Sequence, residues 1–158
     1  MAMDLNLVKS SLPVAVPMVA TLNMEFVDLN YTTAVLRLPD QPAFHNHVAG
    51  PHAGAMFTLG ESASGALVLA NFGDLLGEAT PLAVEAKIRY LKLAMGDLTA
   101  TATISRDAAE VIAELQSGSR PDFEVEIEFR TADDTVTGAM TVVWTLKPNR
   151  KKETNHGV

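Results

Sequence analysis

The residues with the clearest chemical potential lie in one stretch, FHNHVAGPHAGAMFTLGESASG, which runs from Phe44 to Gly65. Three histidines and an asparagine come first, and a single acid, Glu61, follows within a run of small and apolar residues. A carboxylate enclosed by apolar side chains is costly unless it has a partner or a chemical role. Glu61 is therefore a candidate general base or nucleophile, with an ion pair to an arginine or lysine as the structural alternative.

The three histidines of this stretch, His45, His47 and His52, raise the question of a metal site. Zinc sites combine histidines at characteristic spacings with cysteine or carboxylate ligands. The chain has no cysteine, and no partner carboxylate accompanies these histidines. We therefore expect no metal and no bound cofactor.

The apolar run that carries Glu61 predicts one long helix over residues 51–72. Pro51 suits the first helical position, and Gly73 suits the residue just past the end. The run contains several glycines, each of which costs about 1 kcal/mol relative to alanine in a helix. Packing must therefore hold this helix, and its small residues favour a curved sheet that wraps closely around it.

The rest of the chain predicts an antiparallel sheet. Alternating apolar and polar residues predict about six strands, at 22–30, 31–39, 81–94, 97–106, 123–131 and 135–146, in which the first two and the last two form hairpins. Residues 41–50 have no period and predict a loop. A short accessory helix is predicted over 107–118, with Asp107 at its start and Gly118 at its end. The fold class is therefore α+β.

Length and composition favour one domain, which we place at residues 1–147, with 1–20 peripheral and 148–158 as a polar, disordered tail. The apolar stretch after Lys9 resembles a signal peptide only superficially, because Asp4 precedes the lysine and two prolines interrupt the stretch. The net charge of −7 argues against a nucleic-acid partner. We expect a cytoplasmic protein that has no membrane span.

The loop and the helix together resemble the hot-dog fold, and specifically the phenylacetyl-CoA thioesterase-like branch of acyl-CoA thioesterases. That branch has the loop N-x-x-G-x-x-H-[GA]-G and a helix carboxylate nine residues after the histidine. The chain matches it at Asn46, His52, Gly54 and Glu61. The order of elements also matches, over residues 20–147. The resemblance implies a curved antiparallel sheet of about six strands that wraps around one long central helix.

The chain departs from this pattern at four places. The branch usually has His-Gly-Gly where Ala53 stands second here, and it often has aspartate in place of Glu61. Ala49 takes the place of the loop glycine. Ala83 occupies a position where some hot-dog thioesterases carry a hydroxyl residue, a role that Thr80 could take.

The resemblance implies hydrolysis of an acyl-CoA to a free acid and CoA, with Glu61 as the base or, as a second choice, the nucleophile. The backbone N–H groups of Ala53 and Gly54 lie in the first helical turn, where unpaired donors and the helix dipole can bind an oxyanion. Asn46 would position the water or hold the loop, and His52 would shape the helix start.

Substrate contacts outside this stretch are also expected. Three cations could meet the phosphates of CoA or simply form a solvent-exposed strand face: Lys87, Arg89 and Lys92. Three apolar residues of the helix are candidates for the acyl pocket: Met56, Phe57 and Leu59.

Helical geometry predicts that the site is shared between two chains. His52 and Glu61 are nine residues apart, which in a continuous helix is a rotation of roughly 180° and a rise of about 13.5 Å. One helix then cannot direct both at one substrate. We therefore expect a homodimer in which the helix start of one subunit faces Glu61 of the other. Such dimers could pair further into tetramers.

Two alternatives of other classes remain. A 3-hydroxyacyl dehydratase or hydratase of the same fold would use His47 and Glu61 as an acid/base pair, although the loop lacks the Pro-Gly pair that those enzymes show. A non-catalytic acyl-CoA-binding protein would explain the departures at Ala53 and Ala83. A transcriptional acyl sensor is disfavoured, because the only basic run, Arg150–Lys152, is too short.

Overall fold

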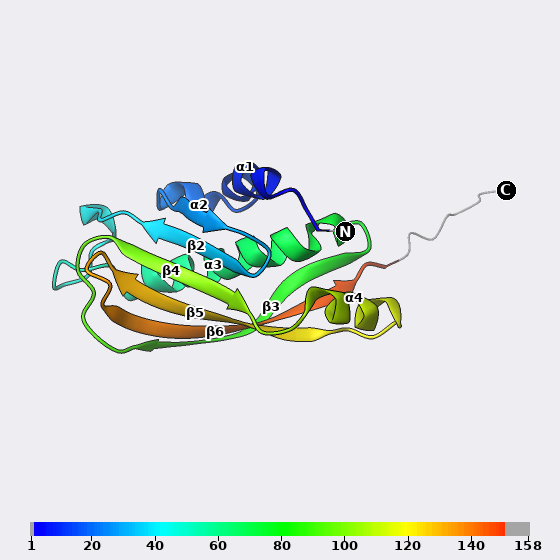
Figure 1. Ribbon diagram of the computed structural model, residues 1–158. Helices are drawn as coiled ribbons and strands as arrows, with labels where there is room; N and C mark the ends of the chain where they lie inside the picture. The colour runs from blue at the N-terminus through cyan, green and yellow to red at the C-terminus, as the bar shows by residue number, and fades with distance from the viewer. Residues whose placement is uncertain (1, 151–158) are drawn as a thin grey trace.

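The computed structural model describes residues 2–150 (Figure 1). Its helices are α1 (Leu5–Ala15), α2 (Pro17–Thr21), α3 (Ala53–Phe72) and α4 (Ala108–Gln116), with short 3-10 turns at Pro42–Phe44 and Gly73–Leu75. Its strands are β1 (Glu25–Leu29), β2 (Thr33–Leu38), β3 (Ala79–Tyr90), β4 (Leu98–Ile104), β5 (Asp122–Thr131) and β6 (Val136–Pro148). These strands form an antiparallel sheet in the order β1-β2-β4-β5-β6-β3. The predicted α+β architecture is confirmed.

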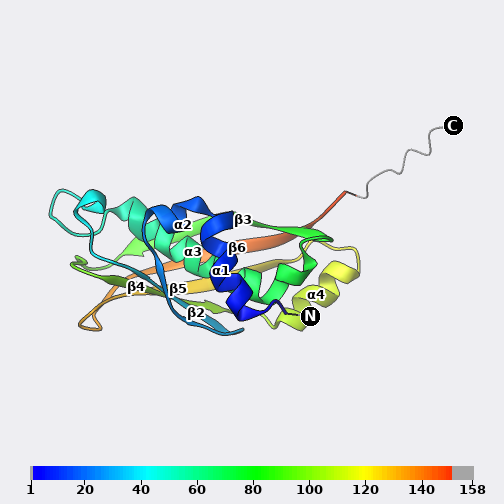
Figure 2. The ribbon, with the colours of Figure 1, turned by 90° about the horizontal axis from the view of Figure 1, so that it is seen from above.

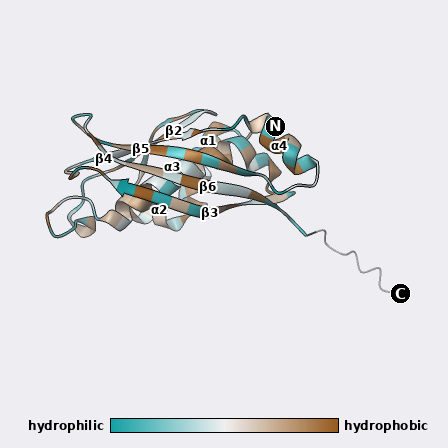
Figure 3. Ribbon diagram, turned by 90° about the horizontal axis from the view of Figure 1, so that it is seen from below, coloured by the Kyte–Doolittle hydropathy of each residue, from teal (hydrophilic) through white to brown (hydrophobic). Residues whose placement is uncertain are grey.

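The sheet curves around α3, as Figure 1 shows. Side chains on its inner face alternate with exposed ones, most regularly along β5, where Phe123, Val125, Ile127 and Phe129 are buried and the residues between them are exposed. Figure 3 shows the same alternation as hydrophobic and hydrophilic colours along this strand. The buried ring of Phe72, at the end of α3, packs against Phe123 with 5.0 Å between ring centroids. The inner face of the sheet and the central helix therefore share one core.

The central helix begins two residues later than the sequence predicts. Pro51 does not occupy the first turn; instead His52 has extended backbone angles and caps the helix, and Ala53 is the first helical residue. The predicted end is confirmed, because the Gly73 N–H closes the last turn on the Leu69 carbonyl. By length and composition α3 could cross a membrane, yet most of it is buried within the protein. That burial is the property of a core helix.

The N-terminal segment forms two helices, α1 and α2, that the sequence analysis did not predict. Pro13 lies inside α1, a position that ordinarily costs about 3 kcal/mol, and Pro17 begins α2. The Asp4 carboxylate caps α1 by accepting from two backbone N–H groups. Figure 2 shows both helices lying across α3 on the side away from the sheet. Their buried residues Val8, Leu12 and Val19 explain why tertiary packing prevails over the prolines.

The two edge strands of the sheet differ in length. β1 is a short edge strand of 5 residues, whereas β3, at the opposite edge, has 12. Residues 91–94 lie beyond β3, so the strand predicted over 81–94 ends earlier than expected. The predicted tail also begins later than 148, because the Asn149 side chain bonds to Thr80 and to the Leu76 carbonyl. The remainder of the predicted tail, 151–158, lies outside the described residues.

Close packing between α3 and the sheet requires a glycine at position 60. A Cβ on Gly60 would lie 2.6 Å from Phe129 Cζ and 2.7 Å from Met140 Sδ, both within the core. A Cβ on Gly65, five residues further along α3, would meet the Trp144 ring at 3.8 Å, which is an ordinary contact. The same substitution therefore has opposite consequences at the two positions.

We expect Gly60→Ala to lower the free energy of unfolding by about 1 kcal/mol or more, because overpacking outweighs the gain in helix propensity. Gly65→Ala should raise it by up to about 1 kcal/mol. Urea unfolding of both variants measures the difference. Equal effects of the two substitutions would contradict the close contact at Gly60.

Candidate active site

The loop before α3 is closed on itself. His45 and Pro51 form an isolated antiparallel bridge, and the His52 N–H donates to the Phe44 carbonyl at 2.8 Å. The Asn46 side chain lies inside this loop, where its Oδ1 accepts from the N–H groups of Val48 at 3.0 Å and Gly50 at 3.1 Å. Its Nδ2 donates to the Pro51 carbonyl at 3.3 Å. Of the two roles predicted for Asn46, these bonds describe the one that holds the loop.

Ala49 stands where the related thioesterase loop has glycine, and its backbone conformation is unfavourable for alanine. Ala49 has φ of +61°, in the left-handed region that favours glycine. Gly50, the next residue, has no room for a side chain, because a Cβ there would overlap the Ala94 carbonyl. The loop therefore packs tightly against Ala94 and Met95 although its left-handed position carries an alanine.

Of the two backbone N–H groups predicted to bind the oxyanion, those of Ala53 and Gly54, one is unpaired among residues 2–150. The Gly54 N–H donates to His52 Nδ1 at 2.8 Å, so this predicted oxyanion donor is engaged in capping the helix. The Ala53 N–H has no hydrogen-bond partner among residues 2–150. Because His52 Nδ1 is an acceptor, the neutral imidazole carries its proton on Nε2. The helix start therefore presents the Ala53 N–H, with the His52 Nε2–H as a neighbouring donor.

Tyr90 fixes the helix start to the sheet, a role that the sequence analysis missed. Its hydroxyl donates to the Ala53 carbonyl at 3.0 Å, and partial burial raises the pKa of Tyr90 above its ordinary value. Thr58 makes a second bond in this turn, from Oγ1 to the Gly54 carbonyl at 2.8 Å. Nothing in the sequence shows which backbone atom the Tyr90 hydroxyl would reach.

Beyond its first turn, α3 has one stripe of residues that is only partly buried within the part of the chain described, and Glu61 lies on it. The stripe consists of Phe57, Thr58, Glu61, Gly65 and Leu69. The Glu61 carboxylate makes no hydrogen bond and no ion pair with any of residues 2–150. The structural alternative of an internal ion pair therefore has no partner there. Burial raises the pKa of the Glu61 carboxyl above its ordinary value.

A buried pair of polar side chains holds the helical turn of Glu61. The Ser64 hydroxyl donates to the Glu61 carbonyl at 2.7 Å and accepts from the Trp144 indole N–H at 3.0 Å. Ser64 is fully buried, so these bonds are shielded from water. The position of Glu61 is thus connected to β6 through two hydrogen bonds.

The rotation argument for a shared site does not survive the correction at His52. Since His52 caps the helix from outside, only residues from Ala53 onward follow the helical count. Gly54 and Glu61 are seven residues apart and lie on the same face, separated by about 10.5 Å along the axis. For Gly54 the separation from Glu61 is therefore one of distance only, whereas Ala53, eight residues before Glu61, is also turned from it by about 80° around the helix axis.

Two cavities flank the first turn of α3. One, of about 380 Å³, has Asn46, Ala53 and Lys92 among its lining residues, together with Met56 and the apolar residues that follow β3. The other, of about 490 Å³, includes His52, Gly54 and Thr58 and lies beside α2. His47, which a dehydratase would need, is exposed and lines neither cavity. Of the apolar acyl candidates, Leu59 is fully buried in the core.

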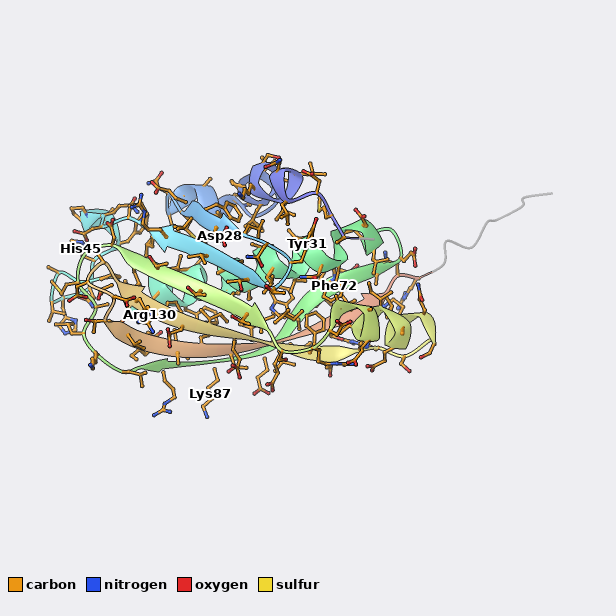
Figure 4. All side chains as sticks on the ribbon, in the orientation of Figure 1. Asp28, Tyr31, His45, Phe72, Lys87 and Arg130 are labelled. Atoms are coloured by element: carbon orange, nitrogen blue, oxygen red, sulfur yellow. The ribbon has the colours of Figure 1, made fainter. Side chains whose placement is uncertain are left out.

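The predicted CoA-binding cations are divided between two faces. Lys92 lines the smaller cavity beside Asn46. Lys87 and Arg89 line a groove of about 820 Å³ on the outer face of the sheet, which they share with Glu126 and Glu128. Figure 4 shows Lys87 pointing away from the body of the protein. Within one chain, only Lys92 is therefore adjacent to the helix start.

The matched family model covers residues 6–146 and is described as DUF4442, a domain of unknown function. The chain belongs to the DUF4442 family. No curated protein matches this DUF4442 chain in sequence.

Solved structures share its fold. A Pseudomonas aeruginosa protein described as of unknown function and a probable thioesterase has 22% identity and a TM-score of 0.81, covering 94% of this chain and 99% of its own. A thioesterase family protein from Silicibacter pomeroyi has 20% identity and a TM-score of 0.73, covering 92% and 100%. The PaaI protein of the Escherichia coli phenylacetic acid degradation operon has 13% identity and a TM-score of 0.68, covering 90% and 95%. The predicted hot-dog fold of this DUF4442 protein is confirmed.

The raised pKa of Glu61 has a consequence for stability. Because the folded state binds this proton more tightly than the unfolded state, the Glu61 contribution to stability falls as pH rises from about 4.3 through the raised pKa. We expect Glu61→Gln to raise the free energy of unfolding at neutral pH and to have a smaller effect below about pH 4. Denaturation at several pH values checks this, and a variant less stable at neutral pH would mean that the carboxylate has a stabilising partner.

Proposed function

We propose that this protein hydrolyses an acyl-CoA thioester to a free acid and CoA, with no cofactor other than the CoA portion of the substrate. The observation that carries the proposal is the carboxylate of Glu61, half-buried and unpartnered within residues 2–150, on the helix whose first N–H group is also unpaired. The thioesterase descriptions of several structural neighbours support the same chemistry.

The helix start would stabilise the transition state. As water adds to the thioester, the carbonyl oxygen becomes an oxyanion, which the Ala53 N–H and the positive end of the helix dipole would bind. The His52 Nε2–H is a second donor at the same turn. The Gly54 N–H joins this group only if the imidazole of His52 releases it.

Glu61 would act as the general base. Its carboxylate takes one proton from the attacking water as the oxygen bonds to the carbonyl carbon. The carbonyl then re-forms as the carbon–sulfur bond breaks, and the proton held by Glu61 passes to the departing thiolate, which leaves as CoA and restores the carboxylate. The raised pKa makes the ionised carboxylate of Glu61 a stronger base. The buried Ser64 and Trp144 hold its helical turn in place for this step.

The site would be shared across a homodimer. Glu61 lies about 12 Å along α3 from Ala53, which favours a carboxylate supplied by a second subunit. The long strand β3 has a free outer edge among the described strands, and its side chains Leu82 and Val84 are exposed. A free edge of this length and apolarity needs covering in solution, and a second copy of β3 would cover it. Two such dimers could pair into a tetramer through the groove on the outer face of the sheet, which Lys87 and Arg89 line.

The polar end of the substrate would lie in the cavity beside Asn46. Lys92 supplies a positive charge there for the phosphates of CoA, which makes it the first of the three predicted cations to test. Lys87 and Arg89 would contact CoA only if the partner subunit brought the outer face of β3 close to the site. A cytoplasmic location suits an acyl-CoA substrate.

Two variants test the mechanism through release of free CoA thiol from a panel of acyl-CoAs. Glu61→Gln should lower kcat by at least about a hundredfold, since it removes the base. Ala53→Pro should lower kcat by about a hundredfold to a thousandfold, because it removes only the N–H donor and proline suits the first helical position. Ala53→Gly, which keeps the N–H, is the matched control.

Each variant tests one of the proposed roles. Activity near that of the wild type in Ala53→Pro would remove the oxyanion role from this N–H. A small effect of Glu61→Gln on a folded protein would favour the acyl-CoA-binding alternative or a different base.

A further inference from the structure

The cavity beside α2 has no role in the chemistry described so far. We propose that it binds the acyl chain of the substrate and that Met18 sets the limit on the length of that chain. This inference rests on the proposed thioesterase function.

The lining of this cavity suits a hydrocarbon. Met18 and Leu22 come from α2 and the residue that follows it, Ala43 and Phe44 come from the 3-10 turn, and Ala55 comes from α3. No lysine, arginine, aspartate or glutamate is among its lining residues. A volume of about 490 Å³ lies within the range of small-molecule sites, which are mostly apolar with a few polar groups at fixed positions.

The polar groups of the cavity lie where the reacting carbonyl would be. His52 and Thr58 belong to the cap and to the second turn of α3, and Gly54 lies between them. Thr58 is three residues before Glu61 on the same open stripe. A chain whose carbonyl meets the helix start can therefore extend from there toward α2.

The two cavities differ in charge, which gives the substrate a direction. Lys92 places a cation in the cavity that contains Asn46 and Ala53, whereas the cavity beside α2 is apolar apart from His45, His52 and Thr58. The anionic end of an acyl-CoA favours the first and its hydrocarbon end favours the second. Ala53 and Gly54 are consecutive residues, one in each lining, so a thioester at the helix start would lie between them.

Met18 is the residue best placed to limit the chain. It lies on α2, a helix of 5 residues outside the sheet, and it is 54% exposed although it lines the cavity. Its thioether side chain is flexible and apolar, so it can close the far wall without fixing its shape. Leu22 is almost fully buried, and a change there would disturb the core as well.

A chain-length profile tests this assignment. With acetyl-, butanoyl-, hexanoyl-, octanoyl- and palmitoyl-CoA, kcat/KM of the wild type should rise roughly fourfold for each methylene buried, until the cavity is full. Met18→Trp should lower the ratio of kcat/KM for octanoyl-CoA to that for butanoyl-CoA at least tenfold, and Met18→Ala should move the optimum to longer chains. Val14→Trp, on the exposed surface of α1, is the matched control for an added indole.

The outcomes separate this inference from the function on which it rests. Thiol release with the same octanoyl-to-butanoyl ratio in Met18→Trp and Val14→Trp would overturn the acyl-chain assignment and leave the thioesterase proposal intact. If no acyl-CoA is hydrolysed, calorimetry of octanoyl-CoA binding to the same variants decides. Weaker binding in Met18→Trp alone would support the cavity assignment while the hydrolase proposal fails, and equal binding would overturn both.

Discussion

Enclosure of α3 by the sheet is the constraint on which the rest of the structure depends. A helix with glycine and serine at so many positions has little intrinsic stability, and its burial against β2, β4 and β5 holds it together. Gly60 lets the helix approach Phe129 and Met140 closely, and the N-terminal helices cover the side that the sheet leaves open. The one partly open stripe that remains is the one that carries Glu61.

This enclosure also produces the chemistry at each end of the proposed site. Burial raises the pKa of Glu61 and removes competing partners within residues 2–150, so the carboxylate keeps its basicity. At the helix start, the cap formed by His52 and the bond from Tyr90 fix the first turn, and the Ala53 N–H has no partner in the described part of the chain. The positions of Glu61 and of the Ala53 N–H are therefore determined by the packing of α3 and by the cap at its start.

The sequence predicted the fold well because periodicity reports burial directly. The alternation along β5 and β6 and the apolar run of α3 placed these three elements close to their observed bounds. The prediction was wrong where tertiary contacts outweigh local preference. Because of their prolines, α1 and α2 were not predicted as helices, and because Pro51 favours a first helical position, the start of α3 was predicted two residues too early. Within the candidate site, residue types predict roles for Glu61 and the helix start. The engagement of Gly54 by His52 and the bonds of Asn46 depend on loop geometry that no spacing rule encodes.

The central claim is that one chain supplies the helix start and a second chain supplies Glu61, and subunit mixing tests it most directly. Inactive Ala53→Pro and Glu61→Gln proteins would be unfolded together, refolded in equal amounts and assayed for thiol release. If sites are shared, half of the dimers are mixed and each of these has one intact site, so activity should return to about a quarter of the wild-type value. No recovery, with mixed dimers shown to form, would contradict the account and place both groups of a working site in the same chain.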